Sequence, residues 1–453
     1  MRVAFVMWPA AAHLYPFVPL AWALKAAGHE VCVVSHASIA ETTASMGLTP
    51  VSWCDPNSMP VPMGPGRPYP EERADLARIT DAMAFGPDDP DREHWDVFTQ
   101  FYLPSMWDFI PFKGDPGEPM PAMDGLVEFT RTWKPDLVLW DPCVPGAAVA
   151  ARVCGVAQAR WWTAPDVFCR SIDRFAEVTG RPGAPAVENP LVETVRPMAD
   201  RYGVEVDTEL LFGQWTVNPQ PPAVGPAVSA RTMPVRWIPH SSQEVMPDWV
   251  YPVPARPRVA VSLGLSERQF MAGGWNHIPA LLEALSTLDV EVVATLNKTQ
   301  LEAVSTIPDN VRVVEFVPLN HLIPTCSLLI HHGGMGTAMP AVANCVPQIV
   351  LDFVGHEISA TGSGGRMGRS RYSLGPALSR YVTETGAGLV MNVSKPNAQE
   401  MREQIQRVLT EPSFQEGAAR VHNDLLATPS PAEFVPILER MVTQYRQQES
   451  TSH

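Results

Sequence analysis

Residues 328–342 read LLIHHGGMGTAMPAV, a strand that breaks on glycines and opens a helix. The apolar run 328–330 predicts a buried strand, and the alanine-rich end of the stretch can start a helix. Glycine lets a backbone approach an anion closely, and the first turn of a helix offers free N–H groups and a partial positive charge. His331 and His332 would add hydrogen-bond donors at the rim. The residues alone leave two interpretations open, a diphosphate-binding loop and an ordinary turn.

The overall composition predicts two domains and excludes several classes of partner. A chain of 453 residues is too long for one compact core. Its formal net charge of −15 argues against nucleic acid or an anionic membrane as the main partner. No apolar run is long enough to span a bilayer, and we expect no signal peptide at the start, MRVAFVMW. The seven cysteines are scattered and never in CxxC spacing, which favours reduced thiols in a cytoplasmic protein over disulfides or a zinc site.

The first α/β pattern begins at the N-terminus. An apolar strand at 2–8 is followed by a loop of small residues that ends at His13, then by a helix with Pro16 in its first turn and a strand at 30–35. This order predicts a right-handed parallel crossover. Asp141 follows another predicted strand, 137–140. Both polar residues therefore lie at the carboxyl ends of predicted parallel strands, the edge where ligands bind in open α/β sheets.

Two stretches interrupt the α/β patterns. Residues 55–125 are irregular and rich in proline and aspartate, yet they carry several aromatic residues. Because aromatic residues are scarce in disordered chains, we expect an ordered helical excursion that lines an apolar pocket or docks a partner; a disordered insertion is the alternative. Residues 237–257 are proline-rich without periodicity and predict a linker between the domains.

A second α/β pattern follows this linker. Ser262 lies at the end of a strand predicted at 258–263, and Asp352 follows a strand predicted at 349–351. Residues 361–376 are rich in Gly, Ser and Arg and predict a loop. Further strands are predicted at 290–296, 310–316 and 386–391, and helices at 278–288, 397–409 and 431–447.

His13 and Asp141 are candidates for acid–base chemistry. Imidazole can take a proton near neutral pH, and a carboxylate can hold the ring and stabilise the imidazolium. The alternative is a histidine bonded to a loop carbonyl and an aspartate that caps the next helix. No GxSxG motif and no cluster of metal ligands supports a hydrolase or a metalloenzyme, and the first loop, PAAAH, lacks the GxGxxG pattern of dinucleotide-binding enzymes.

The second half offers weaker candidates, each with a structural alternative. Ser262 could bond a phosphate or cap the end of its strand. Residues 316–319 could offer a flat apolar surface to a base or form a plain turn. The loop 361–376 could close over an anion or stay solvated.

Taken together, these segments resemble the two-domain GT-B family of nucleotide-sugar-dependent glycosyltransferases. The likeness is greatest to the macrolide and polyketide antibiotic branch, which includes the erythromycin desosaminyltransferase. HHGGxGT preceded by VPLxxLxPTC is its most specific part. The segments that carry the resemblance are FVPLAWALKAAGHEV (17–31), RTWKPDLVLWDP (131–142), FGQWTVNP (212–219), MPDWV (246–250), RVAVSLGLSER (258–268), VPLNHLIPTC (317–326), HHGGMGT (331–337) and SPAEFVPILE (430–439).

The resemblance implies an α/β GT-B fold with two Rossmann-like domains whose parallel sheets face a central cleft. It implies inverting transfer of a deoxysugar or aminodeoxysugar from a TDP-sugar to a hydroxyl of a macrolide or polyketide aglycone, in antibiotic biosynthesis. No cofactor and no metal are expected, because donors and a helix dipole can stabilise the leaving diphosphate. The implied domains are an acceptor domain at 1–236, a linker at 237–257, a donor domain at 258–430, and a C-terminal helix and tail at 431–453 that can pack back on the first domain.

The resemblance also assigns roles to residues. His13 matches the base that deprotonates the acceptor hydroxyl, and Asp141 matches its acidic partner. The positions that match the diphosphate loop are His332, Gly333, Gly334, Gly336 and Thr337, with Ser262 near the phosphates. The positions that match the nucleobase contacts are Phe316, Val317 and Leu319.

One segment departs from the family pattern. Many relatives carry an acidic residue followed by Gln after the strand predicted at 349–351, and this pair bonds sugar hydroxyls. Here Asp352 is followed by Phe-Val-Gly and then by His356 and Glu357. The change is compatible with a donor sugar that has few hydroxyls, and it makes Asp352, His356 and Glu357 the candidates for sugar contacts.

The resemblance further implies partners and leaves alternatives. Several desosaminyltransferase-like enzymes need an auxiliary protein related to cytochromes P450, whose contact we would place in 55–125, and a homodimer is compatible with the family. Neither nucleic acid nor a membrane is expected as a partner. The competing functions are a non-hydrolysing sugar-nucleotide epimerase and a non-catalytic nucleotide-sugar-binding protein of the same fold.

Overall fold

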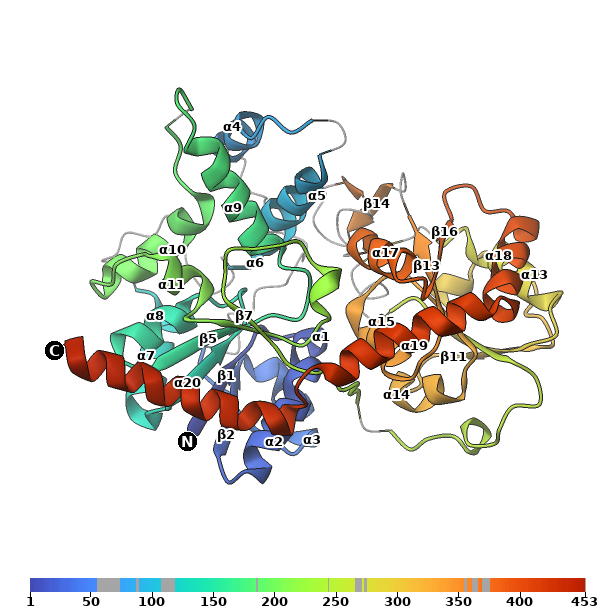
Figure 1. Cartoon of the computed structure of the whole chain (residues 1–453), viewed down its shortest axis with the longest axis horizontal. Helices are drawn as coiled ribbons and strands as arrows, with labels where there is room; N and C mark the ends of the chain where they lie inside the picture. The colour runs from blue at the N-terminus through green and yellow to red at the C-terminus, as the bar shows by residue number, and fades with distance from the viewer. Residues whose placement is uncertain are drawn as a thin grey trace. The chain divides into compact units, whose positions relative to one another are not determined.

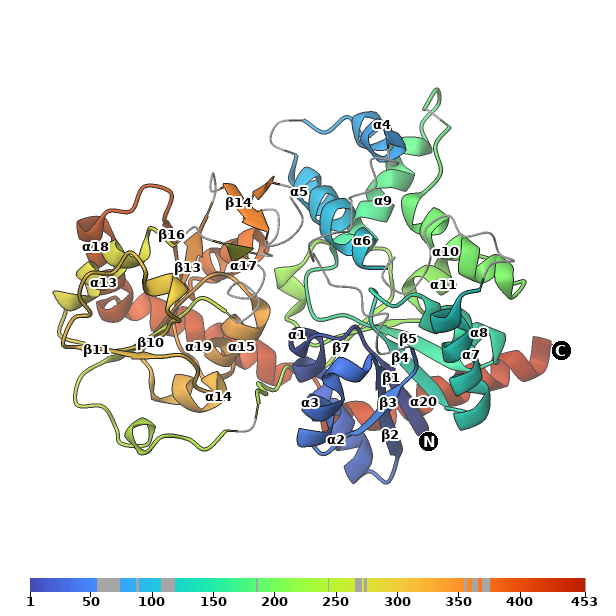
Figure 2. The ribbon, with the colours of Figure 1, turned by 180° about the vertical axis from the view of Figure 1, so that it is seen from behind.

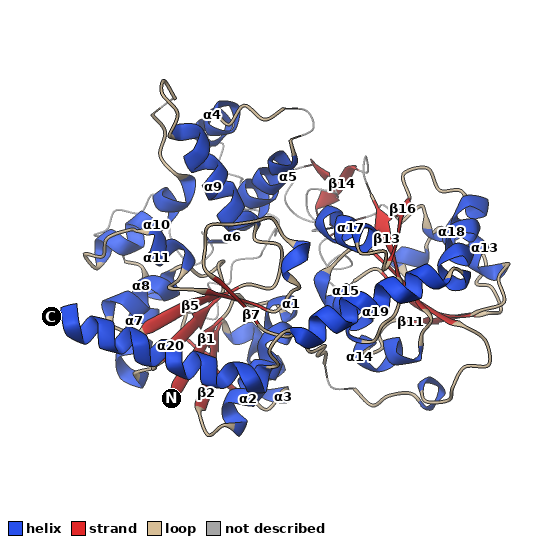
Figure 3. Ribbon diagram, viewed as in Figure 1, coloured by secondary structure: helices blue, strands red, loops and turns tan. Residues whose placement is uncertain are grey.

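The chain folds into two compact α/β units, drawn in Figure 1 and coloured by secondary structure in Figure 3. Unit 1 comprises Met1–Pro219, Gly225–Val235 and Pro429–His453, and unit 2 comprises Gln220–Val224 and Arg236–Thr428. The structure is a computed structural model that describes residues 1–54, 74–86, 89–106, 119–184, 186–242, 244–264, 271–272, 275–353, 357–360, 366–368 and 375–452.

Unit 1 is built on a seven-stranded parallel sheet in the order β3-β2-β1-β4-β5-β6-β7. The chain starts in the middle of this sheet, runs to one edge, and returns to the other side of β1 at β4. The strand order therefore reverses between β1 and β4. The strands are β1 (Arg2–Val6), β2 (Glu30–Ser35), β3 (Thr49–Ser52), β4 (Leu137–Trp140), β5 (Ala157–Trp161), β6 (Thr216–Asn218) and β7 (Thr232–Pro234).

The C-terminal helix α20 (Pro431–Ser452) runs across one face of the unit 1 sheet, in front of the strands in Figure 1. Its Phe434, Leu438 and Val442 recur every four residues and so share one face of the helix. They are buried in one cluster with residues of β1, β2 and α2 (Val18–Ala26). The sequence predicts this helix only to residue 447, because the polar end carries no apolar periodicity.

The opposite face of the unit 1 sheet is covered by α7 (Pro121–Trp133) and α8 (Gly146–Val153). These helices lie in front of the strands in Figure 2, which shows the molecule from behind. Unit 1 also contains α3 (Ala40–Ser45), α9 (Val167–Thr179), α10 (Pro190–Arg201), α11 (Thr208–Phe212) and the 3₁₀ turn η2 (Ala37–Ile39).

The first helical turn begins earlier than the sequence predicts. Residues 9–13 are predicted as a loop, with a helix that begins at Pro16, but α1 spans Ala11–Leu14 and the 3₁₀ turn η1 spans Tyr15–Phe17 before α2 begins. Pro16 lies at the start of η1, where its missing N–H breaks no hydrogen bond. His13 therefore lies on a short helix rather than in a loop.

The described part of the aromatic-rich segment 55–125 is helical, as predicted. Trp95 and Phe98 are fully buried and contact aromatic rings of α9, with centroids 6.4 Å apart for Trp95–Phe175 and 5.4 Å for Phe98–Phe168. The elements that precede α7 in this segment are α4 (Ala74–Ala82), α5 (Pro90–Val97), the π-helical turn η3 (Phe98–Tyr102) and α6 (Leu103–Met106).

An ion pair adds to this packing. Arg170 of α9 donates from Nε to an oxygen of Asp91 on α5 at 2.8 Å. Burial alone would raise the pKa of Asp91, but the hydrogen bond and charge of Arg170 lower it below its usual value. Trp95 and Phe98 thus belong to an internal core that holds α5 on α9. Trp107, which belongs to the same predicted excursion, lies outside the described residues.

Unit 2 repeats the topology of unit 1. Its six-stranded parallel sheet has the order β11-β10-β8-β12-β13-β16, so the strand order reverses between β8 and β12. The strands are β8 (Arg258–Ser262), β10 (Glu291–Thr295), β11 (Val311–Val314), β12 (Leu328–His331), β13 (Gln348–Asp352) and β16 (Gly388–Asn392).

Alternating side chains bury both faces of the unit 2 sheet. Val259 and Val261 pack in the cluster with α13 (Ile278–Ser286) and α18 (Ala398–Thr410), while Ala260 packs in the cluster on the opposite face. The further helices of unit 2 are α14 (Leu319–Leu322), η8 (Ile323–Thr325), α15 (Met335–Ala343), α17 (Gly375–Glu384) and α19 (Pro412–Ala427).

The segment predicted as the loop 361–376 contributes to a small antiparallel sheet. This sheet has the order β15-β14-β9, formed by β9 (Met271–Ala272), β14 (Glu357–Ala360) and β15 (Arg366–Gly368). Gly375 then begins α17. The prediction of an unstructured loop was wrong for these residues, because the pairing that makes β15 a strand comes from distant segments that local composition does not reveal.

The predicted linker 237–257 groups with unit 2. Its Met246 and Val250 are buried in one cluster with Val317 and Leu322. Among the described helices of both units, none is long and apolar enough to cross a membrane.

The packing of α20 yields a testable expectation. Leu438 is fully buried. Leu438→Ala should lower the free energy of unfolding of unit 1 by about 2–5 kcal/mol, because truncation leaves a cavity between α20 and the sheet. The measurement is urea-induced unfolding followed by circular dichroism. Arg440→Ala, at an exposed position of the same helix, is the control and should change stability by less than about 0.5 kcal/mol. Equal effects of the two substitutions would contradict the packing role of α20.

Candidate functional site

Polar residues gather at the point where the strand order reverses in each unit. In unit 1, His13 follows β1 and Asp141 follows β4. In unit 2, Ser262 ends β8, and the glycine-rich turn follows β12. In open parallel sheets the crevice at such a reversal, beyond the carboxyl ends of the strands, is where ligands bind. Each unit therefore brings its predicted site residues to its own binding edge.

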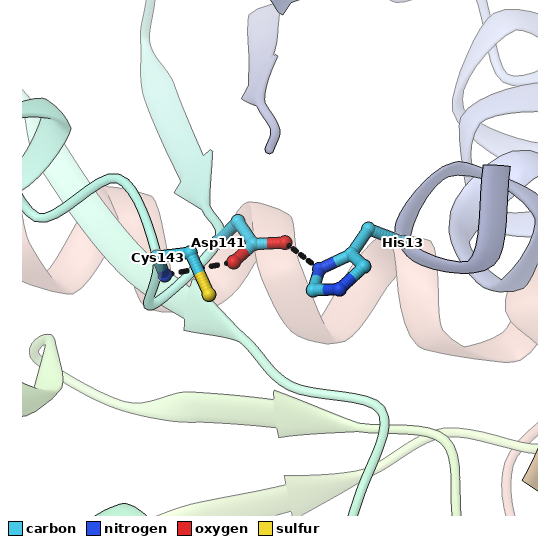
Figure 4. A group of neighbouring side chains, drawn as sticks. All are labelled: His13, Asp141 and Cys143. Carbon is cyan, nitrogen blue, oxygen red and sulfur yellow. Dashed lines mark hydrogen bonds and ion pairs between the residues drawn. The ribbon is translucent and has the colours of Figure 1, made fainter. Parts of the chain in front are cut away.

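His13 and Asp141 form a hydrogen-bonded pair, drawn in Figure 4. The distance between His13 Nδ1 and Asp141 Oδ2 is 2.5 Å. The Asp141 side chain is 3% exposed and that of His13 is 20% exposed, so the acid is enclosed while the ring reaches solvent. The ring of Trp8 lies beside His13, with centroids 5.0 Å apart.

Backbone contacts fix the orientation of Asp141. Its Oδ1 accepts the N–H of Cys143 at 2.8 Å, and its own N–H donates to the carbonyl of Val6 at 2.9 Å. With Oδ2 facing Nδ1, a neutral His13 carries its proton on Nδ1 and its lone pair on Nε2. The ring nitrogen on the side away from the carboxylate is then ready to accept a proton (Figure 4).

The same residues could be considered as a metal site. Ligand atoms of His13, Asp141 and Cys143 lie within 4.8 Å of one another, a donor set that suits Zn²⁺. However, Nδ1 and Oδ2 are bonded to each other, so a cation held by these two atoms would have to displace that hydrogen bond. The geometry fits a proton-transfer pair better than a metal centre, and the expectation of no metal stays a prediction.

In unit 2, the glycine-rich turn leads directly into α15. Gly334 is the N-cap and makes no side-chain capping bond. The N–H of Thr337 turns back to the carbonyl of Gly334 at 3.0 Å. The N–H groups of Met335 and Gly336 lie in the first turn, where a helix supplies no acceptor for them. The turn therefore offers donors and the positive end of the α15 dipole to an anion, and its role as a diphosphate site stays a prediction.

The three predicted glycines of the turn meet different constraints. Gly333 has φ +94°, and a Cβ atom there would lie 2.7 Å from the Cα of Gly375. A Cβ atom at Gly334 would lie 2.4 Å from Nε2 of His332, and the same ring excludes a side chain at Gly264. A Cβ atom at Gly336 would meet nothing within 4 Å. Gly336 thus borders open space beside the helix end, while the other two are required by close packing.

His331 has a different role from the one that the sequence predicts. The prediction of a donor at the rim was wrong, because the side chain is completely buried and its Nδ1 accepts the N–H of Gly333 at 3.2 Å. Burial lowers the pKa of His331 to about 3, His332 contributes to the fall, and the amide of Gln348 acts in the opposite direction. The imidazole is therefore neutral at physiological pH.

The other candidate nucleotide-binding residues of unit 2 differ in burial and in contacts. Thr295 donates to the hydroxyl oxygen of Ser262 at 3.0 Å, a partner that the sequence analysis missed because the two residues meet only through strand pairing. Phe316 is half-buried. Val317 is buried in the core and Leu319 packs against it, so their side chains serve packing, and their backbone is what a base could contact.

The candidates for sugar contacts are only partly described. Asp352 is the last residue of β13, so it lies at the same edge of the sheet as the carboxyl ends of the other strands. Glu357 begins β14, and its backbone alone is described, whereas His356 lies outside the described residues. The role of the three residues in sugar contacts therefore stays a prediction.

The buried His331 predicts a specific pH dependence. In the unfolded chain its imidazole takes a proton near pH 6.5, whereas the folded protein keeps it neutral down to about pH 3. Unfolding then takes up a proton in this window, so stability falls as the pH drops below 6.5, by about 1.4 kcal/mol per pH unit. In His331→Asn, the loss of unfolding free energy between pH 7.5 and 5.5 should be smaller by about 1 kcal/mol, as measured by urea-induced unfolding. An unchanged pH dependence would show that His331 is not buried neutral.

Comparisons with known proteins agree with this architecture. Residues 22–264 match the family described as "Erythromycin biosynthesis protein CIII-like, N-terminal domain". Residues 279–366 and 375–441 match the C-terminal domain of the same family.

Similar proteins cover nearly the whole chain. The aclacinomycin-T 2-deoxy-L-fucose transferase of Streptomyces galilaeus is 36% identical, over 98% of this chain and 97% of its own. The 10-deoxymethynolide desosaminyltransferase of Streptomyces venezuelae is 35% identical, over 98% of both chains. The crystal structure of the glycosyltransferase VinC in complex with dTDP superposes with a TM-score of 0.76 at 28% identity, over 98% of this chain and 100% of that chain. The predicted fold class of two Rossmann-like domains is thus confirmed, and the chain belongs to the erythromycin biosynthesis protein CIII-like family.

Proposed function

We propose that the chain is an inverting glycosyltransferase that moves a deoxysugar or aminodeoxysugar from a TDP-sugar to a hydroxyl of a macrolide or polyketide aglycone. The observation that carries the proposal is the His13–Asp141 pair at the binding edge of unit 1, in a chain whose unit 2 carries an anion-binding helix end. Relatives named as deoxysugar and aminodeoxysugar transferases match the chain over almost its full length, which places the reaction in antibiotic biosynthesis.

On the acceptor side, His13 is the general base of the proposal. Its Nε2 takes the proton of the acceptor hydroxyl as the oxygen attacks the anomeric carbon of the donor sugar. The bond from that carbon to the diphosphate oxygen breaks, and TDP leaves with the bonding electrons, so the sugar carbon is inverted. Asp141 keeps the proton on Nδ1 before the reaction and stabilises the imidazolium afterwards.

On the donor side, the turn before α15 is the diphosphate site of the proposal. Charge develops on the leaving diphosphate, and the free N–H groups of Met335 and Gly336, with the α15 dipole, can stabilise it. Ser262 and His332 are further candidates for phosphate contacts. The reaction in this form needs no metal and no cofactor, and it requires the binding edges of the two units to face one another, which stays a prediction.

The partners beyond donor and acceptor are also proposals. Mixing the purified chain with a P450-like auxiliary protein would test whether turnover depends on it, and light scattering would test for a homodimer. The described aromatic residues of α5 and η3 are internal, so an auxiliary protein would have to contact other groups of this segment. A cytoplasmic location fits the seven cysteines, all described and none in a disulfide.

The two competing functions are not favoured. An epimerase or a non-catalytic nucleotide-sugar-binding protein would need no base in unit 1, whereas the chain keeps His13 oriented by an enclosed carboxylate. Mass spectrometry of products from a panel of TDP-deoxysugars and macrolide or polyketide aglycones separates all three. A glycosylated aglycone supports the proposal, and an epimerised donor or unchanged substrates would favour one of the alternatives.

Substitutions of the pair test the base directly. His13→Ala should lower the rate of sugar transfer by about 10²–10⁴-fold, the usual contribution of a general base, and Asp141→Asn should also lower it because the ring loses its fixed tautomer. TDP binding, measured by calorimetry, should stay close to that of the wild type in both variants. Loss of TDP binding in His13→Ala would refute its role as the base.

The proposed diphosphate site, the turn before α15, is tested by adding a methyl group where the ligand would lie. Gly336→Ala should weaken TDP binding by about 10–100-fold without loss of stability, because the new methyl group points into open space in the free protein. Gly86→Ala in unit 1, where a Cβ also meets nothing within 4 Å, is the matched control and should leave TDP affinity unchanged. If Gly336→Ala binds TDP as the wild type does, the diphosphate lies elsewhere.

A further inference from the structure

His331 makes a turn at a strand end of unit 2 that resembles the turn made by Asp141 at a strand end of unit 1. It ends β12, the strand across the reversal from β8, just as Asp141 follows β4, the strand across the reversal from β1. In each case the side chain accepts the N–H of the residue two positions later, Gly333 in unit 2 and Cys143 in unit 1. The two units thus use the same local turn one register position apart, because His331 pairs with the last residue of β8, whereas Trp140, which precedes Asp141, pairs with the last residue of β1.

This i to i+2 hydrogen bond is the pattern of an Asx-turn, which aspartate and asparagine form most readily. Asn392 makes the same bond to the N–H of Ser394 at the end of β16. His36 makes it through Nδ1 to the N–H of Ser38 at 3.1 Å after β2. A histidine can therefore replace the Asx side chain, provided that Nδ1 is an acceptor.

The state of the ring meets this condition. Acceptance at Nδ1 requires the proton of a neutral imidazole to lie on Nε2. His331 is completely buried among β8, β12 and β13, where its register partners are Ser262 and Val350. Burial disfavours the charged form, which would carry a proton on Nδ1 and lose the bond.

The bond determines what the turn presents to a ligand. The Gly333 N–H is tied back to the end of the strand, while φ +94° at the same residue redirects the chain into the N-cap at Gly334. The donors that face outward are then those of the first turn of α15. A different orientation of the Gly333 peptide would move this first turn and its donors together.

We propose that His331 is a positioning residue for the anion site: its neutral ring holds the Gly333 peptide and thereby aims the N–H groups at the start of α15 toward a nucleoside diphosphate. It acts through the backbone and makes no contact with the ligand. The inference rests on the proposed function of this turn, and it assigns the first histidine of the pair a role separate from that of His332.

Three substitutions at one position test the proposal, with TDP as the probe and calorimetry at pH 7.5 as the measurement. His331→Asn restores an acceptor at the Asx-turn position and should bind TDP within about twofold of the wild type. His331→Gln carries the same amide one methylene further out, and His331→Leu carries no acceptor. Both should bind about tenfold more weakly, the equivalent of one hydrogen bond.

The comparison of Asn with Gln separates positioning from stability. Both variants bury one side-chain amide. If His331 served stability alone, the two variants would bind TDP equally, or would differ only as far as their thermal midpoints differ. Equal affinities of these two variants would overturn the inference, and their comparison decides the matter even if His331→Leu does not fold. Failure of the wild-type protein to bind TDP would contradict the proposed function of the turn instead.

Discussion

The reversal of strand order in each parallel sheet is the constraint on which the candidate site depends. β1 and β4 in unit 1, and β8 and β12 in unit 2, send their chains to opposite sides of the reversal, so the loops beyond their carboxyl ends part and leave backbone groups uncovered. His13, Asp141, Ser262 and the turn before α15 all lie on these strand ends. Because both faces of a parallel sheet are buried, its functional polar groups lie at the carboxyl ends of its strands.

Hydrogen bonds from the backbone hold polar groups that are buried at such an edge. Asp141 is held by the N–H of Cys143 and faces His13, and His331 is held by the N–H of Gly333. An unpaired buried carboxylate would be costly, whereas these hydrogen bonds reduce that cost and fix the geometry. The same bonds also orient the groups. The fixed carboxylate of Asp141 determines the tautomer of His13, and the fixed Nδ1 of His331 determines the orientation of the Gly333 peptide.

The sequence predicts the parts of this arrangement that depend on local pattern. Apolar strands, the helix after the glycines and the ends at which His13 and Asp141 lie follow from periodicity and strand order. It does not predict that Thr295 meets Ser262, that residues 366–368 form a strand, or that His331 is an acceptor. Those facts depend on strand pairing between distant segments and on the burial that follows, which local composition does not encode. The boundary of α1 was missed for a related reason, since Pro16 fits both a helix start and a 3₁₀ turn.

The chemistry of the donor turn also limits where sugar selectivity can reside. A turn made of glycines and backbone N–H groups can recognise a diphosphate, a group that all TDP-sugars share, but it has few side chains with which to contact a sugar hydroxyl. Two relatives similar over nearly the whole chain are named for different sugars, 2-deoxy-L-fucose and desosamine. The difference between such sugars must therefore be read by side chains outside the turn. Asp352, at the end of the neighbouring strand β13, is the sequence-based candidate for this task whose side chain the structure describes.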